Sequence, residues 1–181
     1  MNQLRAALLA AALVPLAPGT APAQQTPAPP PVAAPAAYGT PDGLVADLYR
    51  TVSFPAGRTA DWERVRSMFL PGAVIFLRTS RTASTAFTVE GFIDDFVTFS
   101  ARADVMLNGF SERVVKMKPT AYRDVAHVLV LYEAQVPNSQ RGPQLGIDSF
   151  HVVRKDGRWW IAGIVNEIVA PDEPLPAALR D

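Results

Sequence analysis

Apolar residues in the first part of the folded region recur every three or four positions, the spacing of one helix face. Leu44, Leu48 and Val52 define the first such face, directly after the helix-start sequence Thr40-Pro41-Asp42. A second helix is expected after its cap, Thr59 or Asp61, and a third from about Val89. The inward stripes of these later helices are Trp62, Val65, Met68 and Phe69, and Phe92, Ile93, Phe96 and Phe99.

The pattern changes to that of strands after residue 109. Four segments rich in Val, Ile and aromatic residues are predicted as strands joined by turns: 110–117, 125–136, 145–154 and 159–168. A shorter apolar strand is expected at 73–77, followed by a polar loop or edge segment at 79–86. Helices followed by consecutive strands predict an α+β domain with the helices packed on one face of a bent antiparallel sheet.

The last hairpin can be given a register from its turn. A two-residue type I′ turn at Asp156-Gly157 places Arg154 opposite Trp159 and, further along, Asp148 opposite Val165. One face of the hairpin then carries Asp148, Phe150, Val152, Trp159, Ile161, Gly163, Val165 and Glu167. The other face carries Ile147, Ser149, His151, Val153, Trp160, Ala162 and Ile164.

Both faces of this hairpin are largely apolar, although the helices can cover only one of them. The neighbouring strand repeats the feature, since Val128 and Val130 alternate with Leu129 and Leu131. The simplest cover for the second face is another copy of the chain. We therefore predict a sheet-to-sheet homodimer, formed through the face that carries Ser149, His151, Trp160 and Ile164.

The N-terminal residues have the order of an export signal. Arg5 precedes an uncharged run at 6–17, which is followed by the small-residue site Ala21-Pro22-Ala23. We expect a signal peptide at 1–23, a Pro/Ala-rich disordered linker at 24–40 and a single domain at 41–181. The mature chain is then expected in the periplasm or outside the cell, with no membrane span.

Charge and composition exclude several kinds of chemistry. Lys plus Arg equals Asp plus Glu at 17 each, without blocks of one sign, so a nucleic-acid partner is not expected. The absence of Cys removes disulfides and thiolate catalysis. Two His residues without metal-ligand spacing predict no metal, and no nucleophile elbow or phosphate-binding Gly-rich loop is present. We expect no cofactor.

Several motifs resemble the nuclear transport factor 2-like superfamily, a cystatin-like α+β group that includes ketosteroid isomerases and polyketide cyclases. The motifs that carry the resemblance are residues 61–73, 126–128 with 132–134, 146–150 and 158–161. They are similar to those of one branch of the superfamily, which has no assigned reaction. It implies a cone-shaped domain in which helices cover the concave face of the sheet around a cavity. It also implies that Trp159 and Ile161 point inward, together with Asp148 and Glu167.

The resemblance further implies candidate site residues. Enzymes of this superfamily place a carboxylate or an Asp/His pair in the cavity, so the candidate catalytic residues are Asp148, His127 and Glu167. The candidate ligand-binding residues are Trp62, Phe69, Phe92, Phe96, Tyr132, Phe150, Trp159, Ile161 and Val165. A plain alternative exists for Asp61 as a helix cap and for Trp62 as a core residue.

Three functions are compatible with these residues. The leading hypothesis is an exported domain that binds a small, mostly apolar molecule without catalysis. The second is a cofactor-free isomerase, dehydratase or cyclase in which a pocket Asp/His or Glu is the general base. The third is a structural or protein-interaction domain whose cavity is filled by its own aromatic side chains. An open cavity with Asp148 inside it, within hydrogen-bond reach of His127, would favour the second function. A cavity filled by Trp159, Phe150 and the other Phe side chains would count against the first two.

Overall fold

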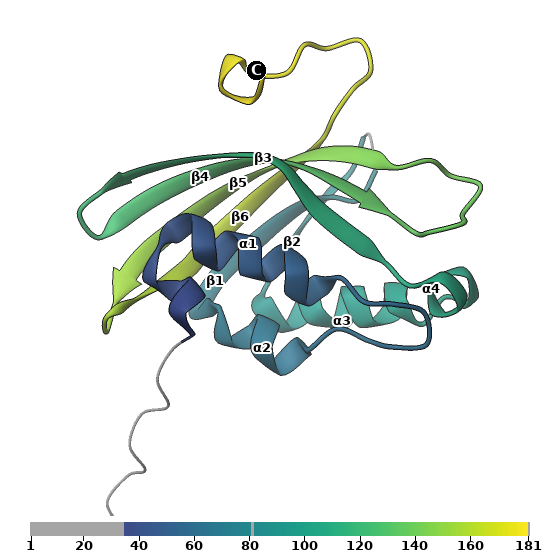
Figure 1. Cartoon of the computed structure of the whole chain (residues 1–181), viewed down its shortest axis with the longest axis horizontal. Helices are drawn as coiled ribbons and strands as arrows, with labels where there is room; N and C mark the ends of the chain where they lie inside the picture. Colours follow the sequence, from purple (N-terminus) through teal and green to yellow (C-terminus); the bar gives the residue numbers. More distant parts are fainter. Residues whose placement is uncertain (1–34, 81, 181) are drawn as a thin grey trace, which may run out of the picture. The chain divides into compact units, whose positions relative to one another are not determined.

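The computed structural model describes residues 35–80 and 82–180, which form an α+β domain (Figure 1). Its helices are η1 Ala36–Gly39, α1 Pro41–Val52, α2 Trp62–Ser67, α3 Val89–Ser100, α4 Ala103–Asn108 and η2 Ala177–Leu179. Its strands are β1 Phe69–Arg78, β2 Ser84–Phe87, β3 Ser111–Tyr122, β4 Val125–Gln135, β5 Gln144–Lys155 and β6 Arg158–Ile168. The expected signal peptide and most of the expected linker lie outside the described residues.

The six strands form one bent sheet in the order β2-β1-β6-β5-β4-β3. All neighbouring strands are antiparallel except β1 and β6, which pair in parallel. Helices α1 to α3 lie on the concave face (Figure 1). The predicted α+β class and the helix-covered bent sheet are confirmed, with one parallel pair in an otherwise antiparallel sheet.

Side-chain caps fix the starts of the three predicted helices. Thr40 Oγ1 accepts a hydrogen bond from Gly43 N at 3.1 Å, and Thr88 Oγ1 does the same for Gly91 N at 3.1 Å. Asp61 Oδ1 accepts from Arg64 N at 3.0 Å, so Asp61 is the helix cap that its sequence context predicts. Each cap satisfies an amide that has no partner within its helix.

The end of the second helix differs from the prediction. Helix α2 ends at Ser67, and Phe69 begins β1 by pairing with Ile161 of β6. Helical spacing had assigned Phe69 to the helix stripe, but tertiary pairing with a neighbouring strand overrides a short helical pattern. The side chain is still buried, at 3% exposure, so the error concerns the element and not the core position.

The domain begins before the predicted boundary at Pro41. Residues 36–39 form a short 3-10 helix in which Tyr38 is almost fully buried. The Arg158 guanidinium lies 5.0 Å from the centre of the Tyr38 ring, a cation–π contact to the last hairpin. The last residues of the expected linker therefore belong to the folded domain.

The hairpin turn is the predicted one, and its register is correct next to the turn. Asp156 and Gly157 both have positive φ values, 52° and 79°, as a type I′ turn requires. Arg154 pairs with Trp159 as predicted. The turn sequence was therefore a sound guide to the local structure.

A β-bulge in β6 changes the register further from the turn. Val152 still pairs with Ile161, but the next pair is His151 with Gly163, which leaves Ala162 as an extra residue. Asp148 consequently lies opposite Asn166 and not opposite Val165. A one-residue shift exchanges the two faces of a strand. The prediction for both faces is therefore wrong beyond residue 162.

The main core lies between the helices and the concave face of the sheet. Its largest fully buried side chains include Tyr38, Leu44, Met68, Ile75, Phe150 and Ile161. A smaller cluster at the α4 end joins Phe54, Ala60, Val105 and Phe110. Helix α4 was not predicted from the sequence, and its Val105 closes this second cluster.

The C-terminal segment packs on the opposite, convex face (Figure 1). Helix η2 contacts β3, and Lys116 Nζ of β3 donates a hydrogen bond to the Arg180 carbonyl at 2.6 Å. Leu179 in this segment and Leu131 of β4 are both buried, although neither belongs to the helix-side clusters. Part of the second apolar face is thus covered by the chain itself. No helix within the described residues is long and apolar enough to cross a membrane.

Candidate functional site

A cavity of about 160 Å³ lies between helices α1 and α3 and the concave face of the sheet. Its apolar wall consists of Leu48, Val52, Ile75, Leu77, Phe92, Phe96, Phe150 and Ile164. Its polar side chains are Tyr49, Arg78, Glu112, Tyr132, Asp148 and Asn166. The space is therefore not filled by aromatic side chains, and Asp148 does lie in its wall, as the sequence predicts.

Asp148 is held by two hydrogen bonds. Tyr49 of α1 donates its hydroxyl hydrogen to Asp148 Oδ2 at 2.5 Å. Asn166 of β6 donates from Nδ2 to Oδ1 at 2.8 Å. Each carboxylate oxygen thus has one donor, and the donors come from opposite sides of the core, one from a helix and one from the adjacent strand. The orientation of the carboxylate is fixed.

Burial raises the pKa of Asp148 to about 6, against the lowering effect of the Tyr49 and Asn166 hydrogen bonds. Burial also raises the pKa of Tyr49, and the neighbouring Asp148 carboxylate raises it further. The same two causes raise the pKa of Tyr132. At neutral pH the cavity therefore contains two protonated tyrosines and an aspartate that is mainly ionised but close to its titration point.

Asn166 connects the polar groups of the cavity. Its Nδ2 donates to Tyr132 Oη at 2.9 Å as well as to Asp148, and its Oδ1 accepts from the Arg78 backbone N at 3.4 Å. Asn166 is 7% exposed. Asn166 was not among the predicted site residues, because a bulge-free register places Glu167 inward instead. An internal Gly163 in β6 is the signal that could have indicated a bulge.

Glu112 of β3 is a second carboxyl in the cavity wall, and it was also missed. Its backbone is fixed by Ser53, whose Oγ accepts from Glu112 N at 2.9 Å and donates to Glu112 O at 3.1 Å. Within residues 35–80 and 82–180, its carboxyl has no hydrogen-bond partner. Burial raises the pKa of Glu112 to about 8, and the Asp148 charge contributes in the same direction.

His127 lies outside the cavity. Its neighbours Ala126 and Val128 point into the core, so the alternation of the strand directs His127 to the convex face. There its Nε2 lies 2.9 Å from Ser149 Oγ, and its ring centre lies 5.5 Å from that of His151. Burial lowers the pKa of His127, as does the neighbouring His151. The expected Asp148–His127 contact is therefore wrong.

Glu167 and Val165 also lie outside the cavity, because the bulge turns them to the convex side. The Glu167 side chain is 57% exposed and forms an ion pair with Arg78 Nε at 3.0 Å. Val165 is 48% exposed. Ile164, which was assigned to the partner face, is buried and lines the cavity instead. The position of Glu167 therefore does not support its assignment as the general base.

The candidate ligand-binding residues divide into two groups. Phe92, Phe96, Tyr132 and Phe150 line the cavity. Phe69, Trp159 and Ile161 are core residues that do not reach it, and Trp62 packs against Phe96 with ring centres 5.6 Å apart. Trp62 Nε1 donates to Thr59 Oγ1 at 3.1 Å. The plain interpretation of Trp62 as a packing residue agrees with these contacts.

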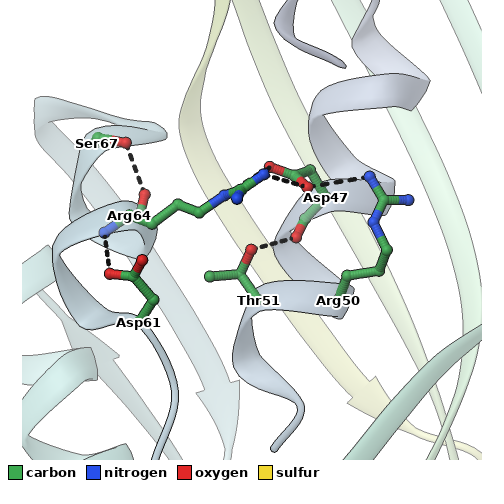
Figure 2. A network of polar contacts seen from close by, with 6 residues as sticks. All are labelled: Asp47, Arg50, Thr51, Asp61, Arg64 and Ser67. Atoms are coloured by element: carbon green, nitrogen blue, oxygen red, sulfur yellow. Dashed lines mark hydrogen bonds and ion pairs between the residues drawn. The ribbon is translucent and has the colours of Figure 1, made fainter. Parts of the chain in front are cut away.

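A separate polar network joins α1 to α2 (Figure 2). Asp47 is 3% exposed, and Arg64 approaches it with two nitrogens, Nη2 at 2.7 Å and Nε at 3.2 Å from Oδ2. Arg50 Nη2 donates to Asp47 Oδ1 at 3.0 Å. These contacts hold two helices together outside the cavity. In the described part of the chain, no group of three or more His, Cys, Asp or Glu could hold a metal ion.

Comparison with known proteins identifies the fold as nuclear transport factor 2-like. An NTF2-like protein with a cystatin-like fold from Novosphingobium aromaticivorans is 13% identical over 76% of this chain and 85% of its own, with a TM-score of 0.57. An NTF2-like protein of unknown function from Pseudomonas putida KT2440 is 10% identical over 74% and 93%, also with a TM-score of 0.57. The sequence-based resemblance is confirmed at the level of fold.

A third solved structure carries a functional description. A candidate scytalone dehydratase from Novosphingobium aromaticivorans is 12% identical over 76% of this chain and 87% of its own, with a TM-score of 0.52. No family model and no curated protein matches the sequence. The structural likeness establishes the shared fold, and at identities this low it establishes nothing more. The fold by itself is compatible with many functions.

Proposed function

We propose that the cavity binds a small, mostly apolar molecule and that Asp148 moves a proton on it without a cofactor, as in an isomerase or a lyase. The observation that carries this proposal is the environment of Asp148. It is a buried carboxyl in the wall of a cavity, oriented by Tyr49 and Asn166. Its general-base role belongs to the second of the three hypotheses from the sequence.

The pKa of Asp148 suits proton transfer at neutral pH. A general base works best when its pKa lies near the operating pH, because it is then ionised and still basic enough to accept a proton. A pKa of about 6 meets both requirements, whereas an ordinary aspartate would be a weaker base. Burial, the first cause of this pKa, is also what excludes water from the bound molecule.

The size and lining of the cavity restrict the ligand. Its volume of about 160 Å³ is close to that of an apolar cavity of roughly 150 Å³ that holds a benzene molecule. The apolar wall favours a hydrocarbon ring, and the polar side favours one or two oxygen functions on it. A ketone, enone or hydroxy ketone of about one six-membered ring satisfies both conditions.

The comparisons support this proposal only in general terms. One similar structure is described as a candidate scytalone dehydratase, while the two with higher TM-scores have no reaction in their descriptions. The support specific to this chain is therefore the polar cluster of the cavity, which joins four side chains from α1, β4, β5 and β6.

Cyclohexanone is a probe of suitable size and chemistry. Removal of a proton beside its carbonyl in D₂O replaces hydrogen by deuterium, which proton NMR measures directly. The protein is expected to accelerate this exchange over buffer, and Asp148→Asn is expected to reduce it by roughly 10²-fold or more. Asp172→Asn, which removes an exposed carboxylate, is the matched control and should leave the rate unchanged.

The same experiment separates catalysis from binding alone. Broadening of the cyclohexanone signals, with exchange at the buffer rate in both wild type and Asp148→Asn, would support binding without catalysis, the leading hypothesis from the sequence. If the cyclohexanone signals show no broadening and no accelerated exchange, both functions are contradicted.

We also propose that the chain is exported to the periplasm or beyond. The support is the order of the N-terminal residues, with one basic residue, an apolar run and a small-residue site. Expression in a bacterial host, followed by fractionation and mass measurement, tests it. A mature chain that begins near Gln24 outside the cytoplasm is expected, and a full-length chain confined to the cytoplasm would contradict it.

A further inference from the structure

Two carboxyl groups share the cavity, although they lie on strands that are not adjacent. Asp148 is on β5 and Glu112 on β3, with β4 between them. The other titratable or charged side chains in the cavity wall are Tyr49, Tyr132 and Arg78. Arg78 forms an ion pair with Glu167, so its charge is already matched. The wall therefore combines two acids with neutral hydrogen-bonding groups.

The two carboxyls have different surroundings. Asp148 accepts one hydrogen bond on each oxygen, which favours its ionised form. The Glu112 carboxyl has no donor among the described residues to stabilise a negative charge, while its backbone is fixed on both sides by Ser53. When one proton is shared between two such groups, it resides on the group without donors. Glu112 is then the acid and Asp148 the base.

We infer that Glu112 is the second catalytic carboxyl of this cavity, and that it gives its proton to the oxygen of a small ketone while Asp148 removes a proton from the carbon beside the carbonyl. This inference rests on the proposed function and extends it to a named acid and a substrate class. A neutral acid that faces a carbonyl oxygen stabilises the charge that develops there as the C–H bond breaks.

The proposed step balances without any further reactant. The Asp148 carboxylate accepts the proton from carbon, the C–H electron pair forms the C=C bond, and the carbonyl oxygen takes the proton of Glu112. The products are an enol, a neutral Asp148 and an ionised Glu112. Return of a proton from Asp148 to carbon, and of the enol proton to Glu112, restores both residues. Return to a different carbon gives isomerisation, and replacement of the Asp148 proton by deuterium from the D₂O solvent before its return gives isotope exchange.

The step predicts a bell-shaped dependence of the exchange rate on pH. The rate requires an ionised Asp148, so it rises as pH increases through the pKa of about 6. It also requires a protonated Glu112, so it falls as pH increases through the pKa of about 8. Because the two groups interact, the two limbs give the pKa values of the pair.

Glu112→Gln tests the acid directly. The amide keeps the shape and a hydrogen-bond donor but cannot release a proton, so cyclohexanone exchange at pH 7 is expected to fall by roughly 10²-fold and to lose the descending limb near pH 8. Glu112→Asp keeps an acid and should retain the descending limb, with a smaller loss of rate. Glu173→Gln, an exposed carboxylate, is the matched control and should behave as the wild type.

The outcomes separate this inference from the proposed function. Exchange that requires Asp148 but is unchanged in rate and pH profile in Glu112→Gln would overturn the role of Glu112 alone. Absence of exchange in the wild type would contradict the proposed function itself. If Glu112→Gln does not fold, carbon NMR titration of the wild-type side-chain carboxyls decides. A Glu112 carboxyl that titrates near 8 supports the inference, and one with an ordinary pKa overturns it.

Discussion

The two faces of the bent sheet differ in how they are covered. Three helices cover the concave face, which contains a cavity whose aspartate, asparagine and tyrosines are joined by hydrogen bonds (Figure 1). On the convex face, the C-terminal segment covers the β3 side, while Val74, Phe76 and Val165 remain 54%, 39% and 48% exposed on β1 and β6. The same alternating strands thus supply a cavity with polar groups on one side and an exposed apolar surface on the other.

The difference shows that polarity alone does not tell the two faces apart. Both carry Val, Ile and aromatic residues, and the buried face holds more of the unusual polar groups, Asp148 and Asn166. Burial of a polar side chain destabilises the fold unless the side chain is hydrogen-bonded, so its presence in a core indicates a functional role. Exposed apolar residues, in contrast, indicate that a surface has a partner when they gather in one patch.

The largest expected effect on stability comes from phenylalanines on the two faces. Phe150 is 1% exposed on the concave side, so Phe150→Ala should lower the free energy of unfolding by roughly 3–5 kcal/mol. Phe76→Ala on the convex side should cost less than about 1 kcal/mol in the monomer. Urea unfolding measures both. Equal losses would show that the convex face is as deeply buried as the core.

The next effect concerns the dependence of stability on pH. The pKa values of Asp148 and Glu112 in the folded chain, about 6 and about 8, lie above their ordinary values, so the folded state binds more protons than the unfolded state over that range. Stability should therefore be greatest near pH 4 to 5 and decrease towards pH 8. At pH 8 the free energy of unfolding of Glu112→Gln should exceed that of the wild type by roughly 1–3 kcal/mol, measured by urea unfolding. The difference should be smaller at pH 5. A constant difference would contradict the raised pKa.

The homodimer predicted from the sequence concerns the convex face, with Val165 in the place that Ile164 was expected to take. Phe76→Glu should convert a dimer to a monomer, because it puts a charge into a buried apolar contact. Leu107→Glu, at a more exposed apolar position on α4, should leave the mass unchanged. Sedimentation at several concentrations measures both. A monomeric wild type would show that no dimer forms.

The smallest expected effect is that of His127→Gln. Because His127 contacts Ser149 and not the cavity, the substitution should change the cyclohexanone exchange rate by less than about 2-fold and leave both limbs of its pH profile in place. A loss comparable with that of Asp148→Asn would restore the Asp148–His127 pair that the sequence suggested. The same NMR measurement serves for both variants.

Much of the fold follows from local signals in the sequence. Thr40, Asp61 and Thr88 precede their helices by the usual capping chemistry, and Asp156-Gly157 makes the expected turn. These signals depend on contacts between residues close in sequence, so they do not depend on how distant segments pack. Helix α2 was overextended because strand pairing, a long-range contact, decided where Phe69 belongs.

The site could be predicted only as far as the register was known. Asp148, Phe92, Phe96, Tyr132 and Phe150 reach the cavity as expected, since they lie before the bulge or on other elements. The residues placed wrongly in β6, Ile164 to Glu167, all follow it. Glu112 was missed for a different reason, because no register had been derived for β3. Strict alternation places Lys116 and Lys118 on the same face as Glu112, and only the irregularity between Val114 and Lys116 separates them, so the sequence carried no clear signal for Glu112.

The extra Ala162 also has a consequence for how this site could change over generations. Deletion of that single codon would remove the bulge but keep His151 opposite Gly163 and Asp148 opposite Asn166, so Ile164 and Asn166 would stay on the inner side. The bulge therefore absorbs one residue of strand length without changing which side chains face the cavity. A lineage could gain or lose this residue and still keep the amide beside Asp148.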